Sequence, residues 1–182
     1  YKPTGLSRTY PNVITFEAVN GMEQLKWSPD ADQVTYDVTK PFIRMVAGPV
    51  DYGQGAMRNA GKDNFHPVWS EPRSQGTRCR QMALYVVVES PLSMMADSPS
   101  SYRANDECAR FIAATPTVWD ETRPLPGEVG KYVVVARRKG TEWYVGGITG
   151  WEEREMEVDL SFTGEGTYHV EIFRDGPKAV RV

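Results

Sequence analysis

The sequence has little of what would direct it to a membrane or to a nucleic acid. Its 182 residues contain no run of about eighteen apolar residues, so no transmembrane helix is predicted. The net charge is -3, which leaves no broad basic surface for phosphate backbones, and we expect no nucleic-acid partner. The first residues show neither a charged leader nor an apolar core, so no signal peptide is predicted.

Cysteine and histidine are also scarce, with two of each. Cys79 and Cys108 fall in two predicted helices without a short metal-binding spacing, which is typical of small buried side chains, and a disulfide stays open. His169 occupies an alternate position of a strand pattern and is predicted to be exposed. His66 precedes Pro67 in a loop, where it is either solvated or lines a cleft.

The most informative segment is residues 10–27, YPNVITFEAVNGMEQLKW. A short β-branched run leads to Glu17, and Glu23 follows six residues later. On one helix these carboxylates would lie roughly 120° apart, so only a turn at Asn20 and Gly21 can direct both into one cavity. Such a pair is consistent with the acid and base of a glycosidase, with oxygen ligands of a hard cation, or with solvated loop residues. The residue types alone favour the solvated reading.

A longer comparison of motifs points to one family. The segment KPTGLSRTYPNVITFEAVNGMEQLKW, residues 2–27, resembles the late barrel of the glycoside hydrolase family 97 enzymes. The likeness continues in order through PFIRMVAGPVDYGQGAMRN, GTRCRQMALYVVVESPL, MADSP, PTVWDETR, ARRKG and WYVGGITGW. The resemblance implies an α-glycosidase for α-galactosides or α-glucosides, with a barrel catalytic domain and a calcium ion in the active site.

The resemblance also implies roles for both glutamates. Glu17 matches a calcium ligand of the family, and Glu23 matches the general acid that protonates the departing glycosidic oxygen. Without that proton the leaving group would depart as an alkoxide. The carboxylate of Glu23 is expected to touch the calcium ion as well, so Ca2+ is the predicted cofactor and Glu17 and Glu23 are its predicted ligands.

The second catalytic carboxylate of the family matches no residue of this chain. We therefore expect the C-terminal section of a longer enzyme, inactive alone, whose partners are its own N-terminal domain and early barrel and an oligosaccharide or α-glycoside substrate. Relatives imply a periplasmic or secreted bacterial enzyme. The resemblance leaves open whether the enzyme retains or inverts the configuration at the anomeric carbon, with a slight preference for retention. The competing hypothesis is a noncatalytic carbohydrate-binding or interdomain β-sandwich module.

The expected fold class is α/β plus all-β. Residues 1–119 are predicted to form the last part of a (β/α)8 barrel, and residues 120–182 an antiparallel β-sandwich. Helices are expected over 40–47, 78–89 and 105–114, and a long loop over 59–76. Strands are expected over 131–136, 142–148, 156–162 and 168–172, where apolar residues recur with period two.

Several other residues have two open interpretations. Trp119, Trp143 and Trp151 either form a sugar-stacking platform or fill a core or interface, which the residue type favours. Phe65 and Trp69 either border the sugar site or anchor the long loop.

The sequence also leaves open the roles of polar residues next to predicted strands. Asp51 lies near the active-site rim or has a structural role. Arg137, Arg138 and Lys139 are predicted to form a solvated hairpin tip.

Overall fold

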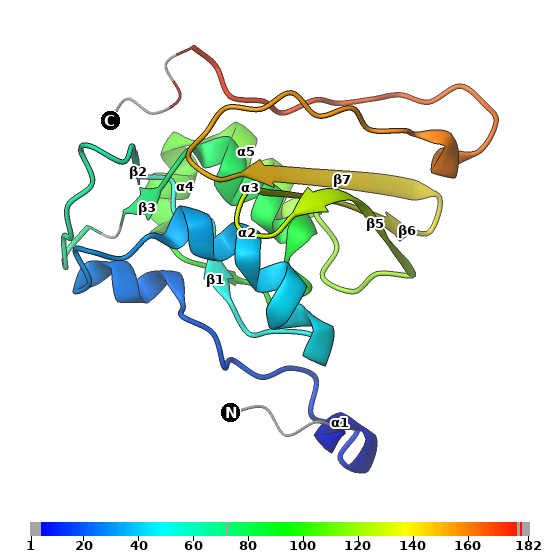
Figure 1. Cartoon of the computed structure of the whole chain (residues 1–182), viewed down its shortest axis with the longest axis horizontal. Coiled ribbons are helices and arrows are strands. Elements are labelled where there is room, and N and C mark those ends of the chain that lie inside the picture. Colours follow the sequence, from blue (N-terminus) through cyan, green and yellow to red (C-terminus); the bar gives the residue numbers. More distant parts are fainter. Residues whose placement is uncertain (1–4, 72, 178, 180–182) are drawn as a thin grey trace.

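The computed structural model describes residues 5–71, 73–177 and 179. Lys2, Pro3 and Thr4 of the KPTG motif, and Pro72 in the long loop, lie outside these residues. Figure 1 shows helices packed on one face of a small antiparallel sheet, with an extended C-terminal segment running along the sheet's outer strand. Within the described part of the chain, no helix has the length and apolar character that crossing a membrane requires.

The helix α2 (Gln33–Ile43) starts earlier than its predicted range of 40–47. Its N-cap is Asp32, whose carboxylate accepts hydrogen bonds from the backbone N–H of Thr35 at 3.0 Å and from its hydroxyl at 2.7 Å. The prediction is wrong because Pro41 is not in the first turn of the helix. It lies near the C-terminal end, and the 3-10 turn η2 (Met45–Ala47) follows.

Two other predicted helices are confirmed. The helix α3 (Arg78–Val87) begins at Thr77, whose hydroxyl accepts from the Arg80 N–H at 3.1 Å, and it is buried along most of its length. It packs between the sheet and α5 (Asp106–Ala114), which follows the short helix α4 (Pro99–Ala104). The remaining helical segments are α1 (Leu6–Thr9) and the 3-10 turn η1 (Met22–Lys26).

The sheet contains β5 (Glu121–Glu128), β6 (Tyr132–Lys139) and β7 (Glu142–Thr149) in that order, all antiparallel. The strands predicted over 131–136 and 142–148 are thus confirmed. The strand β5 occupies the segment taken as the boundary between domains. It carries Pro124 and Pro126, which an edge strand tolerates, and its register shifts between Pro124 and Gly127.

The predicted β-sandwich is not confirmed. Among the described residues, 156–162 and 168–172 form no strand, and Ser161–Thr163 forms the 3-10 turn η3 instead. The carboxylate of Asp159 accepts from the N–H of Ser161 at 2.8 Å and from its hydroxyl at 2.9 Å. Local side-chain bonds of this kind compete with the ladder of a sheet. The segment runs beside β7 without joining it (Figure 1).

The barrel expected for residues 1–119 is also not shown. The described residues contain short parallel pairs, namely β1 (Gly53–Gln54) with β4 (Met94–Met95) and β2 (Asn59–Ala60) with β3 (Ser74–Gln75). A further parallel bridge joins Phe16 to Val50. Parallel pairing is the arrangement that a barrel uses, but these pairs do not close into one.

One core connects the helices with the sheet. Val38 and Leu84 pack in a single cluster with Val133, Val135 and Ile148. The core therefore crosses position 120, and the division into residues 1–119 and 120–182 stays a prediction.

Arg137 was predicted to be solvated, together with Arg138 and Lys139, and this prediction is wrong for Arg137. Its side chain is 1% exposed. The guanidinium donates to the carbonyls of Val86 at 2.6 Å and Val87 at 3.2 Å, and to the hydroxyl of Thr122 at 2.7 Å. The last turn of a helix leaves carbonyls without intrahelical partners, and the planar donors of arginine satisfy them here.

Candidate active site

The parallel bridge between Phe16 and Val50 positions the start of the segment that carries Glu17. The Asp51 N–H donates to the Phe16 carbonyl at 2.9 Å, and the Val50 N–H donates to the Glu89 carbonyl at 2.9 Å. The carboxyl ends of parallel strands meet at one edge. The segment after Phe16, which carries Glu17, and the segment after Val50 therefore leave from the same edge.

Arg44 holds the backbone at this edge. Its guanidinium donates to the carbonyls of Phe16 at 2.7 Å and Glu17 at 3.1 Å, and to that of Gly48 at 3.1 Å. Burial lowers the pKa of Arg44. The next residue after Glu17 is Ala18, with φ 44°, the one non-glycine residue of the described chain with positive φ. Such a backbone costs about 1–2 kcal/mol in alanine, so the turn after Glu17 is strained and is held by Arg44.

Glu23 lies in the first turn of η1, which the buried Met22 and Leu25 anchor against Ala56. Its own side chain is exposed. The carboxylate folds over Gly21, so that any Cβ at position 21 would overlap its oxygens. Glycine at this position therefore permits the observed orientation of Glu23.

The two carboxylates meet only part of the requirement for a calcium site. Both Glu17 and Glu23 are exposed and offer the oxygen donors that Ca2+ prefers. Calcium takes about 6–8 oxygen ligands, however. The described residues include no group of three or more His, Cys, Asp and Glu residues suited to a metal ion. These residues alone therefore do not complete a site.

A buried polar cluster lies behind this edge. Asp37 Oδ1 accepts from Lys40 Nζ at 3.0 Å and from the Tyr52 hydroxyl at 2.8 Å, and Gln33 Nε2 donates to that hydroxyl at 2.7 Å. Arg80 Nη2 lies 3.7 Å from Asp37 Oδ2. Burial lowers the pKa of Lys40 and of Arg80, and it raises the pKa of Tyr52. All five side chains are buried, so the cluster stabilises the fold and cannot reach a substrate.

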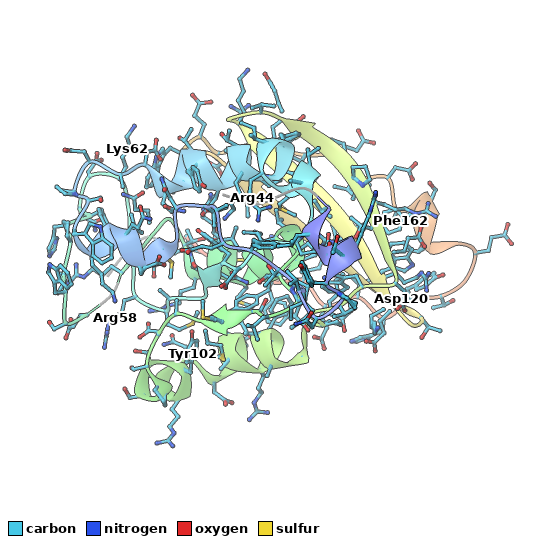
Figure 2. All side chains as sticks on the ribbon, turned by 90° about the horizontal axis from the view of Figure 1, so that it is seen from below. Arg44, Arg58, Lys62, Tyr102, Asp120 and Phe162 are labelled. Carbon is cyan, nitrogen blue, oxygen red and sulfur yellow. The ribbon has the colours of Figure 1, made fainter. Side chains whose placement is uncertain are left out.

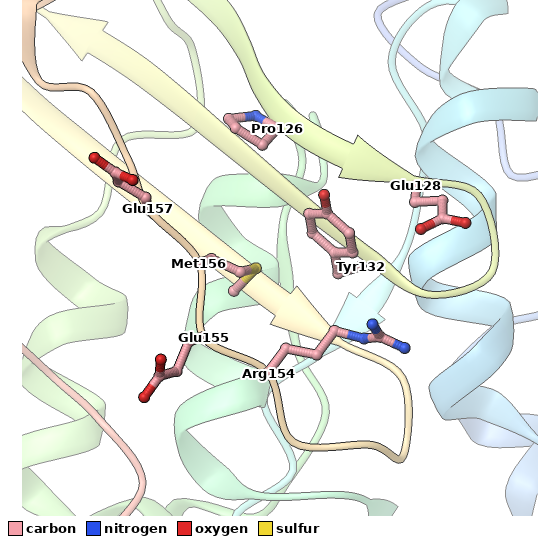
Figure 3. Close-up of a pocket in the computed structure, with 7 residues that line it drawn as sticks. All are labelled: Pro126, Glu128, Tyr132, Arg154, Glu155, Met156 and Glu157. Atoms are coloured by element: carbon pink, nitrogen blue, oxygen red, sulfur yellow. The ribbon is translucent and has the colours of Figure 1, made fainter.

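Neither of the following two cavities of the described chain is lined by Glu17 or Glu23. The first, of about 610 Å³, is lined by Pro126, Glu128, Tyr132, Arg154, Glu155, Met156 and Glu157 (Figure 3). In Figure 3, Tyr132 and Arg154 lie close together while Glu155 and Glu157 point away from them. The guanidinium carbon of Arg154 is 5.9 Å from the Tyr132 ring centroid, and its Nη2 donates to Glu152 at 2.6 Å. One guanidinium nitrogen is thus paired with Glu152, while the buried Nε has no hydrogen-bond partner among the described residues.

The second cavity, of about 330 Å³, lies between α3, α5 and residues 172–176, and it is bordered by Cys79 and Cys108. Both thiols are free, so no disulfide joins them. Burial raises the pKa of Cys79 to about 11, and burial also raises the pKa of Cys108. The thiolate is the reactive form of cysteine, so burial disfavours the reactive form of both residues.

The tryptophans of the second half fill contacts and form no platform. The rings of Trp119 and Tyr144 lie 5.2 Å apart, and those of Trp143 and Phe162 lie 4.7 Å apart. Trp151 Nε1 donates to Asp32 Oδ1 at 2.9 Å, which ties the segment after β7 to the start of α2. The core or interface interpretation is therefore the one that the structure supports.

The long loop has a different arrangement. Phe65 packs against the cluster of Met22 and Leu25 and anchors the loop, while Trp69 is 70% exposed and lies beside Trp27. Figure 2 shows Lys62 of this loop at one end of the molecule and Asp120 and Phe162 at the other end.

The remaining sequence-predicted residues are peripheral. His66 is exposed, and His169 is exposed as predicted. Asp51 has a buried Oδ1 without a hydrogen-bond partner among the described residues, and its role stays open.

Sequence reasoning missed both Arg44 and the cluster around Asp37. Asp37 and Lys40 are three positions apart on a helix, a spacing normally seen in exposed pairs. The sequence places Arg44 shortly before Gly48 and Pro49. That position does not by itself indicate that the guanidinium binds backbone carbonyls of a distant segment.

Comparison with known proteins agrees with the motif series. Residues 118–181 match a family described as "Glycosyl-hydrolase 97 C-terminal, oligomerisation". A retaining alpha-galactosidase of Bacteroides thetaiotaomicron is 62% identical over 182 residues, which are 100% of this chain and 28% of that protein. A probable retaining alpha-galactosidase of Streptomyces bingchenggensis is 34% identical over 175 residues, 96% of this chain and 25% of its own length.

Solved structures show the same relationship. A glycoside hydrolase family 97 enzyme from Pseudoalteromonas sp. strain K8, in complex with acarbose, superposes with a TM-score of 0.73 at 35% identity and covers 88% of this chain and 25% of its own. A beta-arabinopyranosidase gives a TM-score of 0.74 at 30% identity, with 87% of this chain and 26% of its own covered. The chain thus spans 25–28% of the length of these relatives. In its motifs, in the match of residues 118–181 and in its structural neighbours, the chain resembles the enzymes of glycoside hydrolase family 97.

Proposed function

We propose that this chain is the C-terminal part of a retaining α-galactosidase in which Glu23 is the general acid. The observation that carries the proposal is the 62% identity over all 182 residues to a protein named as a retaining alpha-galactosidase. The preference for galactosides over glucosides rests on the names of the two relatives. The rest of the same enzyme, including its second catalytic carboxylate, is the principal partner.

The geometry at the strand edge supports this role. Glu23 is exposed on a short turn whose two apolar residues are buried, so its carboxylate is accessible while the backbone of the turn is held by packing. A positioned carboxylic acid can protonate the glycosidic oxygen as the C–O bond breaks, so that the leaving sugar departs as an alcohol. The proton returns to the same carboxylate when it later activates the water that releases the bound sugar.

The test is the substitution Glu23→Gln in the complete enzyme. We expect turnover of an unactivated α-galactosyl disaccharide to fall on the order of 10²–10⁴-fold. The kcat/KM for an α-galactosyl fluoride should change far less, because this quantity reports cleavage of the bond to fluoride, which departs without protonation. The matched control is Glu153→Gln, which alters an exposed acid elsewhere and should leave both rates unchanged. Unaltered disaccharide turnover in Glu23→Gln would exclude the acid role.

A calcium ion is part of the proposal. Glu17 and Glu23 would contribute carboxylate oxygens, and other parts of the enzyme would complete the ligand set. When bound, the ion supplies positive charge that orients substrate hydroxyls. Glu17→Gln should weaken Ca2+ binding in calorimetric titration of the complete enzyme, while the control Glu153→Gln should not. Equal calcium affinity of Glu17→Gln and the unmodified enzyme would remove Glu17 from the ligand set.

A periplasmic or secreted location is proposed from the family resemblance alone. Fractionation of cells producing the complete enzyme tests it, and recovery in the cytoplasmic fraction would contradict it.

A second function is proposed for residues 118–181 because the matching family is described by oligomerisation. The segment beside β7 carries exposed apolar side chains, among them Val170 and Ile172, which are 64% and 78% exposed. Such side chains gain by burial against a second copy. Light scattering of the complete enzyme should show an oligomer, and Val170→Lys with Ile172→Lys should lower its mass. The same mass in both proteins would place the contact elsewhere.

A further inference from the structure

Two tryptophans from distant parts of the sequence form an exposed pair. The ring centroids of Trp27 and Trp69 are 5.4 Å apart and their planes meet at 35°. The side chains are 50% and 70% exposed. Indole rings lose much of their unfavourable hydration when covered. An exposed pair of this size is therefore a candidate surface for a ligand with an apolar face.

The pair is held by the chain around it. Trp27 ends η1, where its N–H donates to the Gln24 carbonyl at 3.2 Å. Trp69 belongs to the long loop, which Phe65 anchors by packing against Met22 and Leu25 of the same turn. The backbone that carries each ring is therefore anchored, although the rings themselves are exposed.

One member of the pair lies close to the proposed acid along the chain. Trp69 comes from the long loop, and its ring lies beside that of Trp27. Glu23 lies in the first turn of η1, and Trp27 is the C-cap residue of the same 3-10 helix. The surface therefore shares its supporting turn with the proposed general acid.

We propose that Trp27 and Trp69 form an aromatic subsite for the pyranose ring on the leaving-group side of an α-galactoside, an inference that rests on the proposed function. One face of a pyranose presents C–H groups that pack on an indole ring, and its hydroxyls stay in water. The tilt of 35° gives a shallow open surface rather than an enclosed pocket. An open surface suits the departing sugar, which must leave after each turnover, better than the sugar at the reacting carbon.

The experiment compares two substrates in the complete enzyme. One is an α-galactosyl disaccharide, and the other is α-galactosyl fluoride, which has no sugar on the leaving-group side. Trp27→Ala and Trp69→Ala should each raise KM for the disaccharide about tenfold and leave kcat/KM for the fluoride unchanged. Trp27→Phe and Trp69→Phe keep an aromatic face and should restore most of the disaccharide KM.

The outcomes separate the subsite from the reaction itself. Equal KM changes for both substrates, or no change for either, would overturn the subsite while leaving Glu23 in its role. A melting temperature that falls in both Trp69→Ala and Trp69→Leu would assign the pair to packing against the remainder of the enzyme, which also overturns it. Absence of fluoride turnover in the unmodified enzyme would instead refute the proposed function.

Discussion

Lys40 and Asp37 form an ion pair inside the protein, with Nζ 3.0 Å from Oδ1 and both side chains almost completely shielded from solvent. The ammonium group also lies 3.1 Å from the centroid of the Tyr52 ring. Arg80, on α3, approaches the other oxygen of Asp37 and donates to the Val34 carbonyl at 2.8 Å. One carboxylate thus compensates two buried cations and joins α2 to α3.

Removing the carboxylate of Asp37 should strongly lower the free energy of unfolding. Asp37→Ala leaves Lys40 and Arg80 without their buried counterion, and we expect the free energy of unfolding to fall by about 3–5 kcal/mol. Urea denaturation measures this. Asp106→Ala is the control, because its pair with Arg110 is mostly exposed and should change stability by less than about 1 kcal/mol. The double variant Asp37→Ala with Lys40→Met should recover part of the loss, and strictly additive effects would contradict the coupling.

Arg137→Ala should weaken the attachment of the sheet to α3 and so lower the stability of the protein. The substitution removes the donors that serve the carbonyls of Val86 and Val87, and we expect a loss of about 3 kcal/mol in the free energy of unfolding. Its neighbour provides the control. Arg138 is partly exposed and pairs with Glu121, so Arg138→Ala should cost less than about 1 kcal/mol. Similar losses for the two arginines, measured by denaturant titration, would show that burial of Arg137 has little effect.

Ala18→Gly should raise the free energy of unfolding by about 1 kcal/mol, because glycine adopts positive φ without the Cβ clash that alanine has. The same substitution at Ala113, an exposed position of α5, should lower it by about 1 kcal/mol. Opposite signs in thermal melts of the two variants are the expected result. A loss at both positions would mean that the turn after Glu17 is not strained.

Alkaline pH should destabilise the protein through its buried tyrosines. Burial raises the pKa of Tyr102 to about 12 and also raises the pKa of Tyr52, while unfolded tyrosine ionises near pH 10. Between about pH 10 and pH 12 the unfolded state has released protons that the folded state retains, so stability falls as pH rises. The stabilisation is complete below pH 10.

Urea titrations at pH 9, 10 and 11 measure this dependence. Tyr102→Phe removes one of the titrating groups and its hydrogen bond to the Gly55 carbonyl, so it should lower stability throughout and make the alkaline decline less steep. An unchanged slope would show that Tyr102 ionises at its ordinary pKa in the folded protein.

Local patterns predicted the elements whose stability is itself local. The helix after Thr77 has a local cap, the helix after Asn105 has acidic residues in its first turn, and the hairpin of β6 and β7 joins strands adjacent in the chain. The start of α2 was missed because Pro41 was taken as a start signal, although Asp32 is the stronger cap. The strands expected over 156–162 and 168–172 failed because a strand needs a partner, and alternation of apolar residues does not supply one.

Motifs in the sequence indicate the resemblance to glycoside hydrolase family 97 and the candidate acids Glu17 and Glu23, and short-range signals predict several of the helices and strands. The tertiary structure decided which charges are buried, since Arg137 and Arg138 are adjacent in sequence yet differ completely in what covers them. It also brings Trp27 and Trp69 together, since Phe65 packs the long loop against the buried side chains of η1. Burial and proximity depend on residues contributed by other elements, and no local pattern contains that information.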